Sequence, residues 1–313
     1  MPTMQSSIKN IARRSGEAHD SIAGIVAQTP LVFSRDFSDR LGAKIYFKLE
    51  NEQHTGSFKL RGATNSLMSL SAAQREAGCV AASSGNHGVA MAYAMRKLGI
   101  SGVIFVPEQT SSAKVDAIRS CGGNVQFFGT DGLDTEQHAR AYADENGMRY
   151  VSPYNDPTVI AGQGTCGVEI VEQLPTVDAA FVAVGGGGLI SGVGSVLKQH
   201  NPAVSLFGCQ PEASAVMAKS VEAGRVLDLP SETTLSDGTA GGVEPDSITF
   251  ELCRQLVRKF VIVSEAQIAA AMRAYMATEP GSIEGAAGVA IAALEAAKSD
   301  IAGSTVVVII CGG

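Results

Sequence analysis

The sequence contains no uncharged apolar run of the roughly 18 to 20 residues that a membrane-spanning helix needs. Its N-terminal stretch, MPTMQSSIKNIARRSGEAHDS, has no apolar segment of the signal-peptide type. It also lacks a basic block and any interleaving of basic with aromatic residues, and its formal net charge is −7. We therefore expect a soluble protein whose partners are neither membranes nor nucleic acids.

Clustered metal ligands and closely spaced cysteine pairs are absent as well. The six cysteines form no C-x-x-C pair, and the five histidines stand apart from one another. This scatter is typical of reduced thiols in a cytoplasmic protein, and it fits neither a disulfide framework nor a zinc site. We expect a cytoplasmic location and no metal site. The cysteines are Cys79, Cys121, Cys166, Cys209, Cys253 and Cys311.

Glycine, by contrast, is abundant. It accounts for 35 of the 313 residues, without the period of a collagen. A chain of this length can form one large domain or two modest domains that share a core. The glycine content indicates many tight turns or close backbone approaches.

Short apolar runs alternate with amphipathic helical stretches from residue 80 onward. The runs are followed by Gly, Pro or Ser and are apolar on both faces, as in a parallel sheet covered by helices. This alternation predicts right-handed βαβ units and an α/β fold. The predicted strands are 102–106, 124–128, 179–184, 204–209, 259–263 and 305–310, and the predicted helices are 86–98, 111–121, 162–174, 189–199, 265–278 and 285–298.

A lysine stands at the start of a further predicted helix. In the segment NEQHTGSFKLRGA (51–63), Thr55–Gly56–Ser57 resembles a helix N-cap, and Phe58 precedes Lys59. Most lysines in such a place are surface residues. The alternative is a Schiff-base lysine, whose amine must be partly desolvated to act as a nucleophile at neutral pH. This segment alone leaves both interpretations open.

Two further segments indicate anion sites. The stretch ASSGNHG (82–88) leads into a predicted helix, and its polarity exceeds what one N-cap needs, although an ordinary cap stays open. The stretch VGGGGLISG (184–192) places four glycines between a buried strand and a helix, where several backbone N–H groups can converge on one phosphate. It has neither the G-K-[ST] ending of a Walker loop nor the G-x-G-x-x-G pattern.

The C-terminal stretch TVVVIICGG is an apolar strand that ends at Cys311 and two glycines. A buried structural thiol is one interpretation of Cys311. The other is a weak hydrogen-bonding group at the carboxyl end of a strand, where α/β sheets bind their ligands.

Taken in this order, these stretches resemble the pyridoxal-phosphate enzymes of fold type II, within them the serine/threonine dehydratase and serine racemase group. The resemblance covers nearly the whole chain. It implies two domains, each with a mainly parallel twisted sheet flanked by helices: a large cofactor-binding domain of residues 1–77 and 152–313, and a small mobile domain of residues 78–151. The matching motifs are T-P-L (29–31), T-G-S-F-K-x-R-G-A (55–63), S-S-G-N-H-G (83–88), A-G-Q-G-T (161–165), G-G-G-G-L (185–189) and the terminal G-G.

The resemblance also implies roles for single residues in binding pyridoxal 5′-phosphate. Lys59 would hold the cofactor covalently and exchange protons with the substrate. Phe58 and Cys311 would contact the pyridine ring, Asn86 would bond its 3-hydroxyl, and Glu284 matches the acid at the family's helix entry. The backbone N–H groups of the glycine-rich loop would cradle the phosphate; this loop comprises Gly185, Gly186, Gly187, Gly188 and Leu189.

The substrate carboxylate would lie, by the same resemblance, in the serine- and asparagine-containing loop. Ser84 would in addition lie near the face opposite Lys59, where it could act as a second catalytic acid or base. The loop residues are Ser83, Ser84, Gly85, Asn86 and His87.

The chain departs from the family pattern at two places. Cys311 replaces the serine that faces the pyridine nitrogen; a neutral thiol leaves the ring a mild electron sink, which favours loss of a β-leaving group. The group commonly binds a divalent cation through carboxylates after the strand 204–209. Here Gln210 and Val216 stand at those places and Glu212 is out of register, so we expect no cation site.

The resemblance therefore implies a lyase that removes water from a β-hydroxy amino acid and yields a 2-oxo acid and ammonia. A homodimer with a small-molecule amino-acid substrate is implied too. Alternatives are a serine-type racemase that uses Ser84 and a hydroxyectoine-utilisation dehydratase, suggested by S-D-G-T-A-G-G (236–242). A catalytically silent sensor of pyridoxal phosphate or amino acids, and a nucleotide-binding protein, are the remaining hypotheses.

Overall fold

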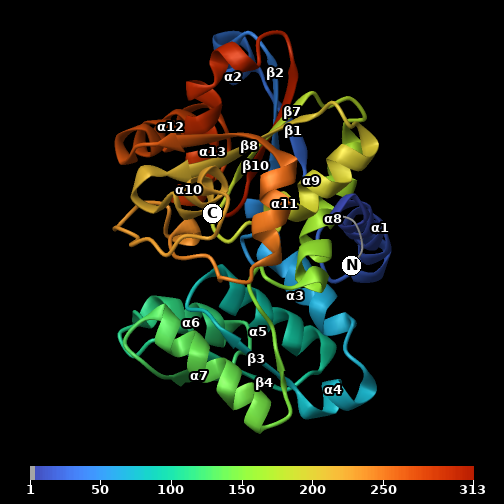
Figure 1. Ribbon diagram of the computed structural model, residues 1–313, viewed down its shortest axis with the longest axis vertical. Helices are drawn as coiled ribbons and strands as arrows, with labels where there is room; N and C mark the ends of the chain where they lie inside the picture. The colour runs from blue at the N-terminus through green and yellow to red at the C-terminus, as the bar shows by residue number, and fades with distance from the viewer. Residues whose placement is uncertain (1–3) are drawn as a thin grey trace.

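The structure is a computed structural model that describes residues 4–313, and its strands form two sheets (Figure 1). The larger sheet has the order β1-β2-β10-β7-β8-β9 and is parallel except for the β1–β2 pair. The smaller sheet, β5-β4-β3-β6, is parallel throughout. The strands are β1 (Leu31–Ser34), β2 (Lys44–Leu49), β3 (Cys79–Ala82), β4 (Gly102–Val106), β5 (Val125–Phe127), β6 (Arg149–Tyr150), β7 (Ala179–Ala183), β8 (Ser205–Pro211), β9 (Val257–Val263) and β10 (Thr305–Ile310).

Helices flank both sheets, so the predicted α/β fold is confirmed. Figure 1 shows α12 and α13 on one side of the larger sheet and α8 and α9 on the other. No helix in residues 4–313 is long and apolar enough to cross a bilayer. The helices are α1 (Met4–Ile22), α2 (Arg35–Leu41), α3 (Lys59–Met68), α4 (Ala72–Ala77), α5 (Asn86–Leu98), α6 (Ser112–Ser120), α7 (Gly132–Glu145), α8 (Pro157–Gln173), α9 (Gly188–His200), α10 (Val216–Ala223), α11 (Ile248–Leu256), α12 (Glu265–Thr278) and α13 (Gly285–Ala296).

One predicted helix begins at the wrong residue. The pattern 162–174 corresponds to α8, which starts five residues earlier at Pro157. The side chain of Asp156 caps this helix by accepting hydrogen bonds from the N–H groups of Thr158 and Val159. A proline in the first turn suits such a start, because its missing N–H needs no partner there.

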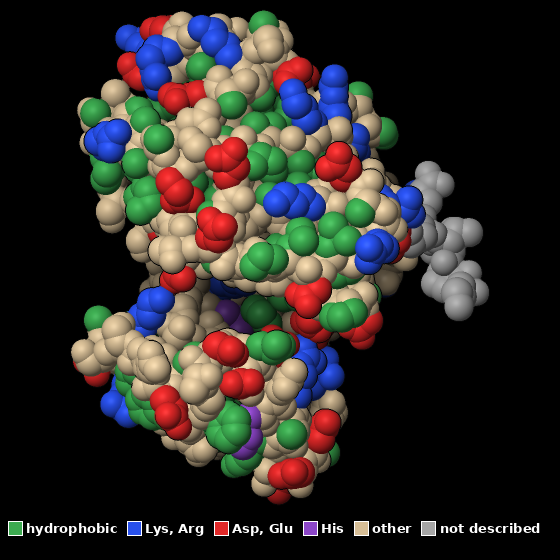
Figure 2. Space-filling model, turned by 60° about the vertical axis from the view of Figure 1, so that its left-hand side comes forward, with side chains coloured by type: hydrophobic (Ala, Val, Ile, Leu, Met, Phe, Trp, Pro, Cys, Tyr) green, Lys and Arg blue, Asp and Glu red, His purple; other side chains and the backbone are tan. Residues whose placement is uncertain are grey.

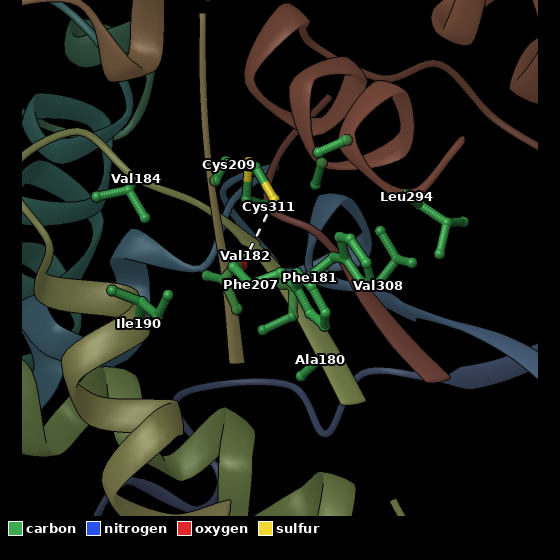
Figure 3. Packing of buried hydrophobic residues seen from close by; sticks show 14 of the residues in the cluster. Ala180, Phe181, Val182, Val184, Ile190, Phe207, Cys209, Leu294, Val308 and Cys311 are labelled. Atoms are coloured by element: carbon green, nitrogen blue, oxygen red, sulfur yellow. Dashed lines mark hydrogen bonds between the residues drawn. The ribbon is translucent and has the colours of Figure 1, made fainter. Parts of the chain in front are cut away.

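The centre of the larger sheet is buried on both faces. Phe181 of β7 and Phe207 of β8 stack with their ring centroids 4.4 Å apart, as the close-up in Figure 3 shows. Val308 of the neighbouring β10 is also fully buried. This packed layer holds the carboxyl ends of β7, β8 and β10 along one edge of the sheet, where the glycine-rich loop and Cys311 follow.

We propose that each sheet forms the centre of one of the two domains implied by the resemblance. The larger sheet belongs to residues 1–77 with 152–313, and the smaller sheet belongs to residues 78–151. All four strands of the smaller sheet lie between Cys79 and Tyr150, which supports these boundaries. Helix α3 packs against both α5 and α8, so the segment after Lys59 lies between the two halves.

A buried ion-pair network anchors α3. Arg61 is fully buried and donates from Nε to Oε2 of Glu50 (2.7 Å) and from Nη1 to Oε1 of Glu169 (2.6 Å). Lys48 of β2, also fully buried, donates to Oε2 of Glu169 (2.5 Å). Arg61 lies two residues after Lys59, so this network fixes the first turn of the helix that carries the lysine.

Replacing Arg61 should strongly destabilise the fold. We expect Arg61→Met to lower the free energy of unfolding by about 3–5 kcal/mol, because Glu50 would lose its ion-pair partner and Lys48 alone would face two buried carboxylates. Denaturant titration measures this change. The control is Arg254→Met: its ion pair with Glu251 is exposed and should be worth less than about 1 kcal/mol. Equal losses in the two variants would contradict the prediction.

Candidate active site

Lys59 is the first residue of α3, and its side chain reaches a cavity between the two halves. Its Nζ donates a hydrogen bond to the carbonyl oxygen of Pro153 (3.0 Å) and lies 5.3 Å from the centroid of the Phe58 ring. Burial lowers the pKa of Lys59 to about 8, although the nearby charge of Glu284 raises it. The amine is thus much more readily neutral than an ordinary lysine.

The turn before Lys59 is tied to the end of the chain. The N–H of Phe58 donates to the carbonyl of Cys311 (3.1 Å), and Ser57 forms an antiparallel bridge with Gly312. Gly56 takes a φ of +73°, a conformation that glycine adopts without steric cost. These contacts therefore fix the position of the start of α3, which carries Lys59, relative to the C-terminal strand.

The glycine-rich loop joins β7 to α9 and leaves no room for side chains. A Cβ built on Gly186 would lie 2.4 Å from the ring of Tyr154, and one on Gly185 would lie 3.1 Å from Cα of Thr239. Gly187 has a φ of +84° and forms the N-cap of α9. The first N–H groups of a helix have no partner within the helix and carry its positive dipole end, so this loop suits a phosphate.

The segment Ser83–His87 follows β3 and opens α5. Asn86 donates from Nδ2 to Oε2 of Glu284 (2.8 Å), and the N–H of Gly85 donates to Oγ of Ser83 (3.2 Å). Nε2 of His87 lies 3.0 Å from the carbonyl oxygen of Val151. Burial, with the nearby charge of Lys59, lowers the pKa of His87 to about 3. Because the imidazole is neutral at pH 7, the segment offers N–H and hydroxyl groups to an anion, not a positive charge.

Glu284 connects the two halves at the far wall of the cavity. Besides accepting from Asn86, it lies with Oε1 3.6 Å from Sγ of Cys311, and its N–H donates to the carbonyl of Gly312. Burial raises the pKa of the Cys311 thiol well above its usual value, and the charge of Glu284 adds to this effect. Cys311 therefore remains a neutral thiol.

These segments converge on one cavity of about 610 Å³. Figure 2 shows the hollow between the upper and the lower part of the molecule, where the two halves meet. The structure brings every predicted site residue to its walls. These residues are Phe58, Lys59, Ser83, Ser84, Gly85, Asn86, His87, Gly185, Gly186, Gly187, Gly188, Leu189, Glu284 and Cys311.

The sequence reasoning missed several cavity residues. Pro153 and Tyr154 lie in the segment that returns from the smaller sheet to the larger one, and Lys114 comes from α6. The sequence gives little indication of Pro153 and Tyr154. They follow the predicted end of the small domain at residue 151, but the strand before them, β6, is only two residues long and was not predicted. The S-D-G-T-A-G-G stretch (236–242) also contributes to the cavity wall, through Asp237 to Gly242.

Two ion pairs link elements around the cavity, and Lys114 and Asp237 of the first pair also line it. Nζ of Lys114 lies 2.8 Å from Oδ2 of Asp237, and Nη2 of Arg140 lies 3.1 Å from Oε2 of Glu244. Each pair joins a helix beside the smaller sheet to the long loop before α11. Within residues 4–313, no group of three or more His, Cys, Asp or Glu side chains is placed to hold a metal ion.

Comparison with known proteins gives consistent relatives. Residues 22–312 match the family described as pyridoxal-phosphate dependent enzyme. The chain is 40% identical to an L-threonine ammonia-lyase of Thermotoga maritima over 95% of its own length and 74% of the relative's. Its fold resembles a processed threonine deaminase isoform 2 of Solanum lycopersicum (TM-score 0.91, 34% identity, 97% of this chain and 89% of that one). Maize serine racemase is similar too (TM-score 0.91, 32% identity, 96% and 94%).

Proposed function

The chain belongs to the family of pyridoxal-phosphate dependent enzymes, and from this premise we propose that it is a dehydratase of the threonine ammonia-lyase type. It removes water from a β-hydroxy amino acid and releases an enamine. Water then hydrolyses this enamine to a 2-oxo acid and ammonia. The observation that carries this proposal is the cavity itself, which joins a lysine of lowered pKa, a glycine cradle for a phosphate and a neutral thiol.

The residues present fit pyridoxal phosphate. The loop that a Cβ would fill is a cradle for its phosphate, and the Lys59 amine is the group that reacts with its aldehyde. We propose that Phe58 and Cys311 contact its ring, with Asn86 and Glu284 at the ring edge. Bound there, the cofactor supplies an electron sink that stabilises negative charge at the substrate's Cα.

The chain's own groups then perform the binding and proton transfers. The hydroxyl and N–H groups of Ser83 to His87 hold the substrate carboxylate and so orient the Cα–H bond. Lys59 Nζ, with its pKa near 8, accepts the α-proton and can return a proton later. Because Cys311 stays neutral, it supplies no negative charge that would stabilise a protonated ring nitrogen, so the ring would remain a mild electron sink, which favours loss of the β-hydroxyl.

The substrate and products provide the direct test. Purified protein is incubated with L-threonine, L-serine, threo-3-hydroxyaspartate, phenylserine and hydroxyectoine, and 2-oxo acid and ammonia are measured. We expect a 2-oxo acid from at least one hydroxy amino acid. A coloured, cofactor-loaded protein that turns over none of them would contradict the lyase and favour a sensor.

Racemisation is the second candidate, because Ser84 lines the same cavity as Lys59. Chiral analysis of the remaining substrate separates the two reactions. If elimination is the main activity, Ser84→Ala should retain 2-oxo acid formation within a few-fold. Selective loss of D-amino acid formation in this variant would assign Ser84 to racemisation.

The lowered pKa of Lys59 predicts how cofactor uptake depends on pH. Attachment of the aldehyde needs the neutral amine, which an ordinary lysine with a pKa of 10.5 rarely supplies at pH 7. Uptake by the apoprotein should accelerate about tenfold per pH unit below pH 8 and level off above about pH 9. Stopped-flow absorbance measures this rate, and a rise that continues to pH 10.5 would contradict the lowered pKa.

We further propose a cytoplasmic homodimer. The resemblance implies the dimer, and the six cysteines, all within the described residues, are free thiols, as a reducing compartment would leave them. Analytical ultracentrifugation of the holoprotein tests the oligomeric state.

A further inference from the structure

We propose that Gln210 is a positioning residue that holds the glycine-rich loop with its side-chain amide, so that this chain binds its cofactor without a divalent cation. The proposal rests on the phosphate-binding role given above to Gly185–Gly188. It starts from a disagreement between this chain and the family pattern, in which carboxylates and a cation belong at this place.

Gln210 uses both ends of its amide. It lies near the carboxyl end of β8 and is only 1% exposed. Its Nε2 donates to the carbonyl oxygens of Val184 (2.9 Å) and Ser214 (3.4 Å), and its Oε1 accepts from the N–H of Ala218 (2.7 Å). One side chain thus joins the residue before the glycine-rich loop to the turn and the helix that follow β8.

The bond to Val184 determines where the first N–H of the loop points. The carbonyl of Val184 and the N–H of Gly185 belong to one planar trans peptide, so they point in opposite directions. When Gln210 holds the carbonyl inside the fold, the N–H of Gly185 is directed away from Gln210, and Gly185 lines the cavity. The N–H of Val184 is also fixed, by the carbonyl of Cys209 (2.9 Å).

The residues around Gln210 do not fit a cation. Two carbonyl oxygens face its Nε2, and oxygen atoms are the ligands that hard cations prefer. Here, however, the amide N–H groups already satisfy both oxygens. Val216 is apolar and buried, and Glu212 is exposed. The Gln210 amide therefore takes the place of a carboxylate with a bound cation, which would otherwise be the partner of these two carbonyl oxygens.

Two substitutions at position 210 test the proposal. Gln210→Met keeps the volume but removes the donors, and we expect the dissociation constant for pyridoxal phosphate to rise about tenfold or more. Gln210→Glu places a carboxylate against the two carbonyls. This variant should show a similar loss of cofactor affinity in EDTA. It should regain most of the affinity in millimolar Mg²⁺, because the cation can then bridge the new carboxylate and the two carbonyl oxygens. Saturated with cofactor, both variants should keep kcat within a few-fold.

The matched control is Gln53→Glu. Gln53 is also buried and also bonds backbone groups at both ends, those of Ala27, but unlike Gln210 it makes no bond to the residue before the glycine-rich loop. This variant and the unmodified protein should bind the cofactor equally well in EDTA and in Mg²⁺, as measured by cofactor absorbance and fluorescence.

Three outcomes would overturn the proposal. They are a loss of cofactor affinity in the unmodified protein on adding EDTA, cofactor binding by Gln210→Met as tight as the original, and no response of Gln210→Glu to Mg²⁺. Failure of the unmodified protein to bind pyridoxal phosphate at all would instead refute the proposed function.

Discussion

Lys59→Ala is expected to abolish turnover. The substitution removes the amine that holds the cofactor and the group that exchanges the α-proton, and loss of proton transfer alone lowers rates by about 10²–10⁴-fold. The fold should persist, because the lysine amine is not part of the buried network around Arg61. The 2-oxo acid assay measures turnover, and borohydride reduction followed by peptide mapping locates the attached cofactor.

The control for this experiment is the second lysine of the cavity. Lys114 is half exposed and paired with Asp237, so Lys114→Ala should still bind the cofactor covalently. Turnover at the original rate in Lys59→Ala, or a borohydride label on another lysine, would refute the assignment of Lys59.

Gly186→Ala is expected to cause a large loss of cofactor affinity. The added Cβ would lie 2.4 Å from the ring of Tyr154. The ring cannot easily move aside, because its hydroxyl accepts a hydrogen bond from the N–H of Glu244 (2.9 Å). Overpacking of this kind costs about 1–3 kcal/mol, so the dissociation constant should rise about 10- to 100-fold, as measured by cofactor absorbance.

A glycine elsewhere supplies the matched control. In α1, a Cβ on Gly16 would meet no atom within 4 Å, so Gly16→Ala should leave cofactor affinity unchanged. If Gly186→Ala also binds the cofactor with unchanged affinity, the glycine-rich loop is not the phosphate cradle.

The elements predicted best are those whose local signals agree. The sequence predicted α5 (Asn86–Leu98), β4 (Gly102–Val106) and β10 (Thr305–Ile310) with the observed bounds, because apolar periodicity and the glycines at 99 and 312 coincide there. Strand β2 was missed because its sequence, KIYFKL, contains two lysines. Lys48 is nonetheless buried, since Glu169, far away in the sequence, neutralises it. Such a partner is visible only in three dimensions.

The candidate site follows the same rule. Segments of unusual composition, such as the four glycines and the serine- and asparagine-containing loop, can be recognised as candidate site residues from the sequence. Pro153 contributes a carbonyl oxygen and Tyr154 a ring face against Gly186. Neither contribution depends on a rare residue type, so composition could not single them out. In the sequence, Gln210 stands out only as a departure from the family pattern. Its proposed role follows from its hydrogen-bond partners, which only the structure shows.

The two ion pairs described above bear on how firmly the two halves are held together. Lys114–Asp237 and Arg140–Glu244 fasten the loop before α11 to α6 and α7 at two points. Any movement of this loop away from the two helices must therefore break both contacts. Lys114 and Arg140 are partly exposed, so dissolved salt screens their pairs. Raising the ionic strength should therefore weaken the hold of α6 and α7 on this loop, part of which lines the cavity.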